Sequence, residues 1–226
     1  MRRFTDKTSW DGSHSSTLFT AATLEASGRH PALADVLNEH LVQWSALESK
    51  RAEAESAITR AHAQVAWADY ALDVTVKAFA NELLRDAGGK ASDKTFRAFF
   101  DVAPSEIVKM ALERELERLE AMWLVATKVK LSKRATAALE AMRAAAEEGS
   151  KRVAARREVV AKRALLAMDL TAWRERTDAS RVSVHLQLQQ WAIAHDDETS
   201  YAEQFFADTE PRAKRKSSPS EPPEST

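Results

Sequence analysis

The sequence predicts an all-α fold, an elongated antiparallel helical bundle or coiled coil with two long helices and several shorter ones. Helix-breaking residues are scarce, because the chain has only five glycines and six prolines. Both residue types destabilise helix interiors. Neither occurs between Pro31 and Gly88. Between Pro104 and Pro211, Gly149 is the only interruption. Apolar residues in both stretches recur at alternating spacings of four and three, the period of a coiled-coil seam.

The first half of the chain begins with a polar segment, residues 1–15, which we predict to be a flexible N-terminal arm. A short helix is expected at about 17–27 and should end at Gly28, because glycine commonly follows a helix C-terminus. Pro31 suits the first turn of a helix. It therefore opens the first long helix, which should extend to about Ala87.

A corner follows the first long helix. Residues 88–93 contain two adjacent glycines and are predicted to form the turn. The next segment, 95–100, reads TFRAFF and is strongly apolar. We expect Phe96, Phe99 and Phe100 to be buried at this end of the bundle.

A further helix is predicted to start at Ser105, after Pro104, and the apolar pattern slips at 128–132, where we place a bend. The second long helix follows. Its segment 182–188 alternates apolar and polar residues, as strands do. Helix and strand both stay open for this segment, and helix is favoured because a single strand has no partner to pair with.

The end of the chain is predicted to contain a break at 196–199 and a last short helix with the sequence YAEQFF. The tail, residues 211–226, is rich in proline, serine and charge, a composition typical of disorder. The predicted organisation is therefore one elongated helical domain over residues 16–210, between the arm and the tail.

Composition excludes several classes of function. The chain has 33 basic and 34 acidic residues, so its net charge of −1 provides no general attraction to nucleic acid or membranes. The absence of cysteine excludes disulfides, thiolate nucleophiles and cysteine-bound metals. No apolar stretch is long enough to cross a bilayer, and the N-terminus lacks the apolar segment of a signal peptide. We expect a cytoplasmic protein without membrane insertion.

The sequence shows no pattern of catalytic or metal-binding residues. Metal sites in helical bundles use Glu-x-x-His pairs, and none of the six histidines follows a glutamate at that spacing. The chain has no phosphate-binding glycine loop and no HExxH motif. The acidic run that contains Glu113, Glu115, Glu117 and Glu120 alternates with arginines and is interpreted as a solvated face. We predict no enzyme activity, cofactor, metal or small-molecule substrate.

The chain also has six tryptophans, which is many for so polar a sequence. Five of them fall on predicted helices, mostly on or beside the apolar seam: Trp44, Trp67, Trp123, Trp173 and Trp191. Such residues are either core or aromatic anchors at an interface. The core interpretation is favoured.

A basic segment is the strongest functional feature of the sequence. Residues 128–163 contain 11 basic and 4 acidic residues. Its candidate interaction residues are Lys151, Arg152, Arg156, Arg157, Lys162 and Arg163. These could track phosphates, or pair with carboxylates of this chain or of a partner. Internal pairing is favoured because Arg156 and Arg163 lie in seam register.

These observations predict a non-enzymatic structural or protein-interaction protein, a scaffold or spacer that binds a protein partner or self-associates. The alternative is a nucleic-acid-associated protein that uses the basic segment and the basic tail.

Overall fold

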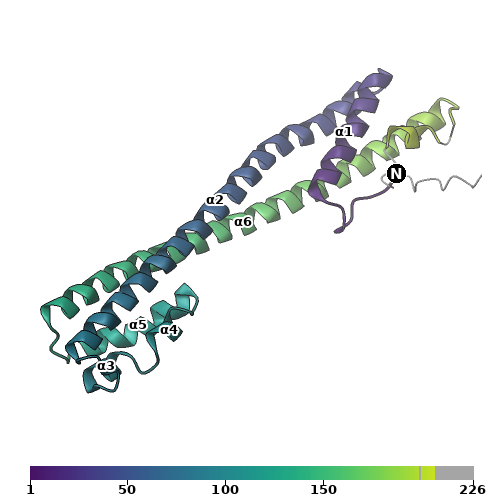
Figure 1. Ribbon diagram of the computed structural model, residues 1–226. Helices are drawn as coiled ribbons and strands as arrows, with labels where there is room; N and C mark the ends of the chain where they lie inside the picture. Colours follow the sequence, from purple (N-terminus) through teal and green to yellow (C-terminus); the bar gives the residue numbers. More distant parts are fainter. Residues whose placement is uncertain (199, 207–226) are drawn as a thin grey trace, which may run out of the picture. The chain divides into compact units, whose positions relative to one another are not determined.

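The computed structural model describes residues 1–198 and 200–206. Within these residues the fold is all-α, as predicted, and contains no β-strand. The elements, in chain order, are α1 (Trp10–Ser27), α2 (Pro31–Asp86), α3 (Lys94–Phe99), α4 (Pro104–Ile107), α5 (Leu112–Ala126), α6 (Lys133–Ala194) and the 3-10 helix η1 (Tyr201–Phe205) (Figure 1). The tail predicted over 211–226 lies outside the described residues.

The two predicted long helices are α2, with 56 residues, and α6, with 62 residues. Segment 182–188 belongs to α6, so its alternating pattern does not form a strand. Helix α2 ends as predicted before two glycines. Gly88 and Gly89 have φ values of 63° and 81°, in the left-handed region that residues with a Cβ rarely adopt.

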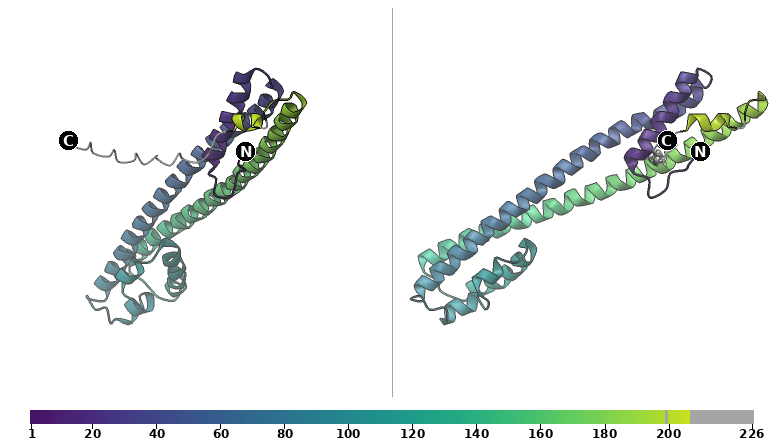
Figure 2. Two further views of the ribbon diagram at one scale, coloured as in Figure 1. Left: turned by 90° about the vertical axis from the view of Figure 1, so that its right-hand side faces the viewer. Right: turned by 45° about the vertical axis from the view of Figure 1, so that its right-hand side comes forward.

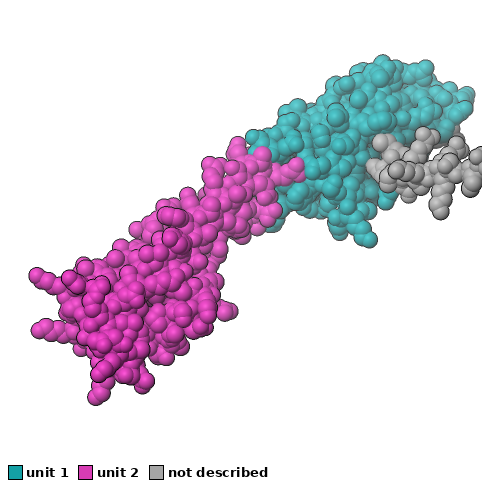
Figure 3. Space-filling view, in the orientation of Figure 1, with its two compact units in different colours: residues 1–49, 166–226 teal, residues 50–165 magenta. Residues whose placement is uncertain are grey.

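The contacts divide the chain into two compact units (Figure 3). Unit 1 comprises residues 1–49 and 166–226, and unit 2 comprises residues 50–165. In each unit, α2 and α6 lie side by side and antiparallel (Figures 1 and 2). In unit 1, for example, Trp173 Nε1 donates to the His40 carbonyl oxygen (2.9 Å).

The sequence predicts one domain over 16–210, whereas the buried residues gather in two groups. No residue of α2 between Trp44 and Ala61 is buried, and none of α6 between Val153 and Leu170. The positions between the groups are mostly small or charged, so they have little apolar surface to bury.

Unit 1 corrects the predicted flexible arm of residues 1–15. Helix α1 begins at Trp10 because the Ser9 side chain accepts a hydrogen bond from Gly12 N (3.0 Å), a typical N-cap. The preceding residues are also held. Phe4 N donates to Asp178 Oδ1 (2.8 Å), and the guanidinium of Arg181 lies 4.2 Å from the centre of the Phe4 ring.

The Arg181 side chain is buried beneath the N-terminal segment. Burial lowers the pKa of Arg181 to about 10, although nearby Asp178 opposes the shift, so the residue stays charged at neutral pH. The aromatic faces of Phe4 and Phe206 on this cation provide a cation–π interaction. The N-terminal segment is therefore part of unit 1.

In unit 2, a continuous helix was expected from Ser105 onward, but the chain leaves the helix after Ile107 and starts α5 at Leu112. The break allows Ile107 and Leu112 both to be buried. The bend predicted at 128–132 is the connection between α5 and α6.

Among the described residues, no helix is both long and apolar enough to cross a bilayer.

Candidate functional site

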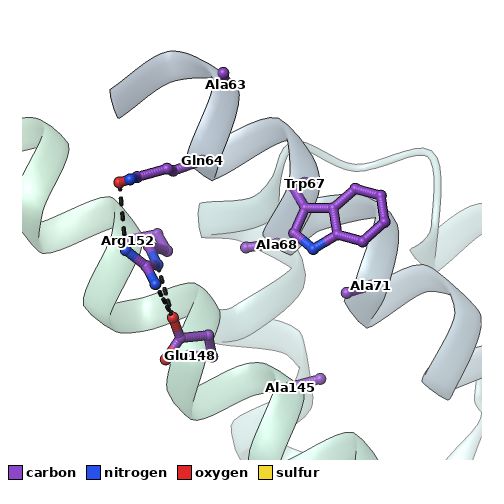
Figure 4. A pocket seen from close by; sticks show the side chains of 8 residues that line it. All are labelled: Ala63, Gln64, Trp67, Ala68, Ala71, Ala145, Glu148 and Arg152. Atoms are coloured by element: carbon purple, nitrogen blue, oxygen red, sulfur yellow. Dashed lines mark hydrogen bonds and ion pairs between the residues drawn. The ribbon is translucent and has the colours of Figure 1, made fainter. Parts of the chain in front are cut away.

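An open groove lies between α2 and α6 in unit 2, and Figure 4 shows the side chains that line it. Its volume is about 440 Å³. The lining residues are Ala63, Gln64, Trp67, Ala68 and Ala71 of α2, and Ala145, Glu148 and Arg152 of α6. Half of them are alanines, whose side chains end at Cβ. The groove is therefore the space that longer side chains would fill in a closed helix pair.

A different side of the same helix pair is covered by α5. Leu72 of α2, Met142 of α6 and Leu119 of α5 belong to one buried cluster. Helix α5 approaches α6 closely at Gly149, where an added Cβ would lie 3.3 Å from a methyl group of Leu112. Gly149 is therefore a close-contact position within the continuous helix α6. The groove beside Trp67 is not covered by α5.

Two aromatic side chains stand exposed at this groove. The side chain of Trp67 is 70% exposed and that of Tyr70 is 59% exposed. Their ring centres are 5.6 Å apart at an interplanar angle of 36°. In Figure 4 the indole of Trp67 lies beside Ala71. Large aromatic residues gain the most from burial, and these two rings are open to solvent in the described chain.

The exposed face of α2 around Trp67 is mostly uncharged over four turns, with Lys77, which pairs with Asp73 (3.7 Å), as its exposed cation. Its uncharged residues recur at spacings of three and four and are exposed or half-buried: Ala63, Ala66, Trp67, Tyr70, Ala71, Val74 and Ala78. We call these seven residues the outer stripe. The buried face of the same segment includes Val65, Leu72 and Val76. Unit 2 therefore has an α2 segment with apolar residues on two faces, of which one is open to solvent.

The polar residues of the groove bind one another. Arg152 Nε donates to Glu148 Oε1 (2.6 Å), and Arg152 Nη1 donates to Gln64 Oε1 (3.3 Å). Small-molecule sites usually present convergent polar groups to the ligand. Here those groups instead join α6 to α2 at one end of the groove, which leaves a mainly apolar surface beside Trp67.

Other residues of the predicted basic segment also pair within unit 2. Arg156 forms an ion pair with Glu113 of α5, and both side chains are 29% exposed. Arg163 forms an exposed pair with Glu55 of α2 (2.8 Å). These pairs link α6 to two neighbouring helices.

The remaining candidates of the basic segment lie at the surface. Lys162 pairs with Glu158 one turn away on the same helix (2.8 Å). Lys151 and Arg157 are exposed, and the described part of the chain gives neither an ion pair. The segment therefore does not form one continuous row of unpaired cations.

The phenylalanines of the corner face inward. Phe96, Phe99 and Phe100 are at most 6% exposed. The ring of Phe99 meets that of Phe79 edge to face, with the centres 5.1 Å apart. Asp93 caps α3 by accepting from Thr95 N (2.8 Å), which fixes the start of this short helix. The corner is thus a core of unit 2 and does not present these rings to a partner.

A group of carboxylates is buried where α5 meets α2. Glu115 is fully buried, and neither of its side-chain oxygens has a hydrogen-bond partner. Burial, with Asp73 and Asp69 nearby, raises the pKa of Glu115 to about 8. The pKa of Asp69 is also raised, by burial first and then by Asp73 and Glu113. Lys77 reaches Asp73 at 3.7 Å. At neutral pH, Glu115 is therefore mainly protonated.

Glu115 is separate from two surface grooves of unit 2. It lines neither the groove beside Trp67 nor a second groove, of about 410 Å³, between α5 and α6.

Among residues 1–198 and 200–206, no group of three or more histidines or acidic residues has the arrangement of a metal site. Comparison with known proteins gives no match to a protein family, a curated protein or a solved structure.

The structure differs from two sequence interpretations. Trp67 was expected in the core, but its neighbour Ala68 occupies the buried position and directs Trp67 outward. Glu115 was assigned to a solvated face, but it shares the helix face of Leu112, Leu119 and Met122. The spacing of three and four among these residues is the signal that could have identified Glu115 as buried.

Proposed function

We propose that this chain is a non-enzymatic structural or protein-interaction protein, and that the groove beside Trp67, with the outer stripe, is its contact surface. The observation that carries the proposal is the exposure of Trp67 and Tyr70 beside a groove lined with alanine. Tryptophan and tyrosine are enriched at protein interfaces and dominate their binding energy. Contiguous exposed apolar surface on a folded protein marks an interaction site.

The internal ion pairs favour this proposal over nucleic-acid binding. An arginine that already holds a carboxylate must break that pair before it can neutralise a phosphate. Arg152, Arg156 and Arg163 all hold carboxylates. Of the six candidates, Lys151 and Arg157 are exposed and have no such pair in the described chain, so the candidates do not form one row of cations that could follow a phosphate backbone.

A cytoplasmic location and the absence of a small-molecule substrate belong to the same proposal. The lack of cysteine in the sequence fits a reducing compartment. The polar atoms of the groove are engaged with one another, which suits a protein surface better than a ligand site.

The proposal can be tested by placing a photo-crosslinking amino acid at position 67 of the full chain, in the cells that produce it. The matched control carries the crosslinker at position 124, because Leu124 of α5 is similarly exposed, at 68%. We expect a discrete protein adduct from position 67 and none from position 124. Adducts from neither position would contradict the proposal, and a nuclease-sensitive adduct would favour the nucleic-acid alternative.

A further inference from the structure

The outer stripe of α2 is self-complementary in an antiparallel arrangement. Pairing the segment with a second copy of itself in the opposite direction, centred between Tyr70 and Ala71, places Tyr70 opposite Ala71. The same register places Trp67 opposite Val74, and Ala63 opposite Ala78. Each large side chain therefore meets a smaller one, which is how packed helix interfaces fill space without voids or clashes.

We propose that the partner of this surface is a second copy of the chain, docked through the outer stripe around a two-fold axis near Tyr70 and Ala71. The inference rests on the proposed function, because it names the partner of the same surface. A two-fold interface requires a patch that complements itself. The outer stripe complements itself because each large side chain faces a smaller one of the second copy. The groove beside it is lined with alanine, so the Trp67 ring of the second copy can lie over these small side chains.

Charge also favours a second copy over an unrelated partner. Identical surfaces repel each other when they carry net charge, and like charges brought together cost binding energy. The seven residues of the outer stripe are uncharged, the exposed Lys77 on the same face is paired with Asp73 (3.7 Å), and the groove contains one charge of each sign, Glu148 and Arg152. Two copies can therefore meet without repulsion, and Arg152 of one copy can exchange its pair for Glu148 of the other.

Burial on α2 supports the same arrangement. A helix with apolar residues on two faces is normally covered on both. The inner face of this segment packs in unit 2, with Leu72 and Val76 fully buried. The outer stripe repeats the spacing of three and four that helix pairs use. A second α2 supplies a cover of matching length and spacing.

The test is sedimentation equilibrium of the purified full chain over a range of concentrations. We expect the mass to rise from that of one chain, 25.1 kDa, towards twice that value. Trp67→Glu and Tyr70→Lys should each weaken self-association at least about tenfold, because both put a charge into an apolar interface. Leu124→Glu serves as the control and should leave self-association unchanged. Circular dichroism verifies that each variant keeps its helix content.

The antiparallel register of the two α2 segments can be tested separately by disulfide formation, because the chain contains no cysteine of its own. Ala63→Cys and Ala78→Cys chains, mixed and oxidised, should form a disulfide-linked dimer, and neither should do so alone. A chain that stays monomeric, or a dimer insensitive to Trp67→Glu, overturns the inference. If the purified chain is monomeric while position 67 still crosslinks to a different protein in cells, the inference fails and the proposed function stands. If position 67 captures nothing as well, both fail.

Discussion

Two tryptophans of α2 have opposite environments, and the contrast separates the two units. In unit 1, Trp44 is 1% exposed, lies 4.7 Å from the Trp173 ring and is stacked on His14 of α1. In unit 2, Trp67 is exposed beside a groove lined with alanine. Both residues lie on or next to the apolar seam of one helix.

The difference comes from the cover that each site receives. In unit 1, α1 lies against Trp44, and Trp10 packs against the same cluster. In unit 2, α5 packs against the inner face of α2, and the outer stripe of the described chain has no helix over it. The contrast teaches that the exposure of a tryptophan on or beside the seam depends on a third element, whose position the pattern of one helix does not specify.

The largest expected effect is at the buried tryptophan cluster of unit 1. Trp173→Ala should lower the free energy of unfolding by roughly 3–5 kcal/mol, because it leaves a cavity and removes the hydrogen bond to the His40 carbonyl. Trp67→Ala, measured at a concentration where the chain is monomeric, should change it by about 0.5 kcal/mol or less. Denaturant unfolding followed by circular dichroism provides both values. Equal losses would remove the distinction between the two sites.

Within unit 2, a substitution in the buried core should lower stability about as much as one in the buried tryptophan cluster of unit 1. Phe99→Ala should cost roughly 3–5 kcal/mol, because the ring is buried against Phe79. Val102→Ala, at a position that is 37% exposed in the same corner, is the matched control and should cost less. An unchanged melting temperature for Phe99→Ala would mean that the corner is not packed and would make it a second candidate surface.

Glu115 should make the stability of unit 2 depend on pH. Its pKa is about 8 in the folded chain and 4.5, the ordinary value for a glutamate, in the unfolded chain, so the folded chain holds an extra proton between these values. The stability contributed by this group is therefore complete below pH 4.5 and is lost as pH rises through 8. One pKa unit corresponds to about 1.4 kcal/mol.

Glu115→Gln removes this titration. The variant should be more stable than the parent at about pH 9, on the order of a few kcal/mol, with a difference that shrinks towards about pH 5. Unfolding free energies at several pH values measure the effect, and Glu117→Gln, at an exposed position of α5, is the control. A difference that does not vary with pH would show that Glu115 is not protonated in the folded chain.

The smallest effects belong to the ion pairs. Arg156→Ala should cost about 1 kcal/mol, since the pair with Glu113 is only partly shielded from water. Arg163→Ala, which removes an exposed pair, should cost less. Both variants should keep the low affinity for duplex DNA that the proposed function implies, measured as gel retardation at several salt concentrations. Strong, salt-sensitive retardation by the parent chain that Arg156→Ala abolishes would contradict the internal role.

The sequence predicted the all-α class and the two long helices because both follow from local residue chemistry. The bounds of α2 follow from Pro31 and from the two glycines after Asp86. The start of α1 was missed because the Ser9 cap outweighs the helix-breaking tendency of Gly12. Glu115 was predicted to be exposed because it is charged, whereas its spacing from Leu112 and Leu119 places it on the buried face of α5.

The site itself was only partly predictable. The alternative that a tryptophan anchors an interface was open from the sequence, and the spacing of four and three places Trp44 on the seam but Ala68, the neighbour of Trp67, there instead. Whether the adjacent face that carries Trp67 is covered is a separate distinction. That distinction depends on where α1 and α5 pack, which is a property of the tertiary fold. The pairing of Arg156 with Glu113 likewise depends on the position of α5, although the seam register of the arginine favoured an internal partner.

Self-association through the outer stripe is tested most directly by measuring how accessible a thiol at the centre of the stripe is to a reagent as protein concentration changes. Ala71→Cys introduces the only thiol of the chain at the centre of the outer stripe, and Leu124→Cys places a thiol on the exposed face of α5. We predict that maleimide labels the thiol at position 71 progressively more slowly as concentration rises through the range of self-association, while labelling at position 124 stays constant. A labelling rate at position 71 that is independent of concentration, in a chain that has formed dimers, would show that the outer stripe is not the surface that binds the second copy.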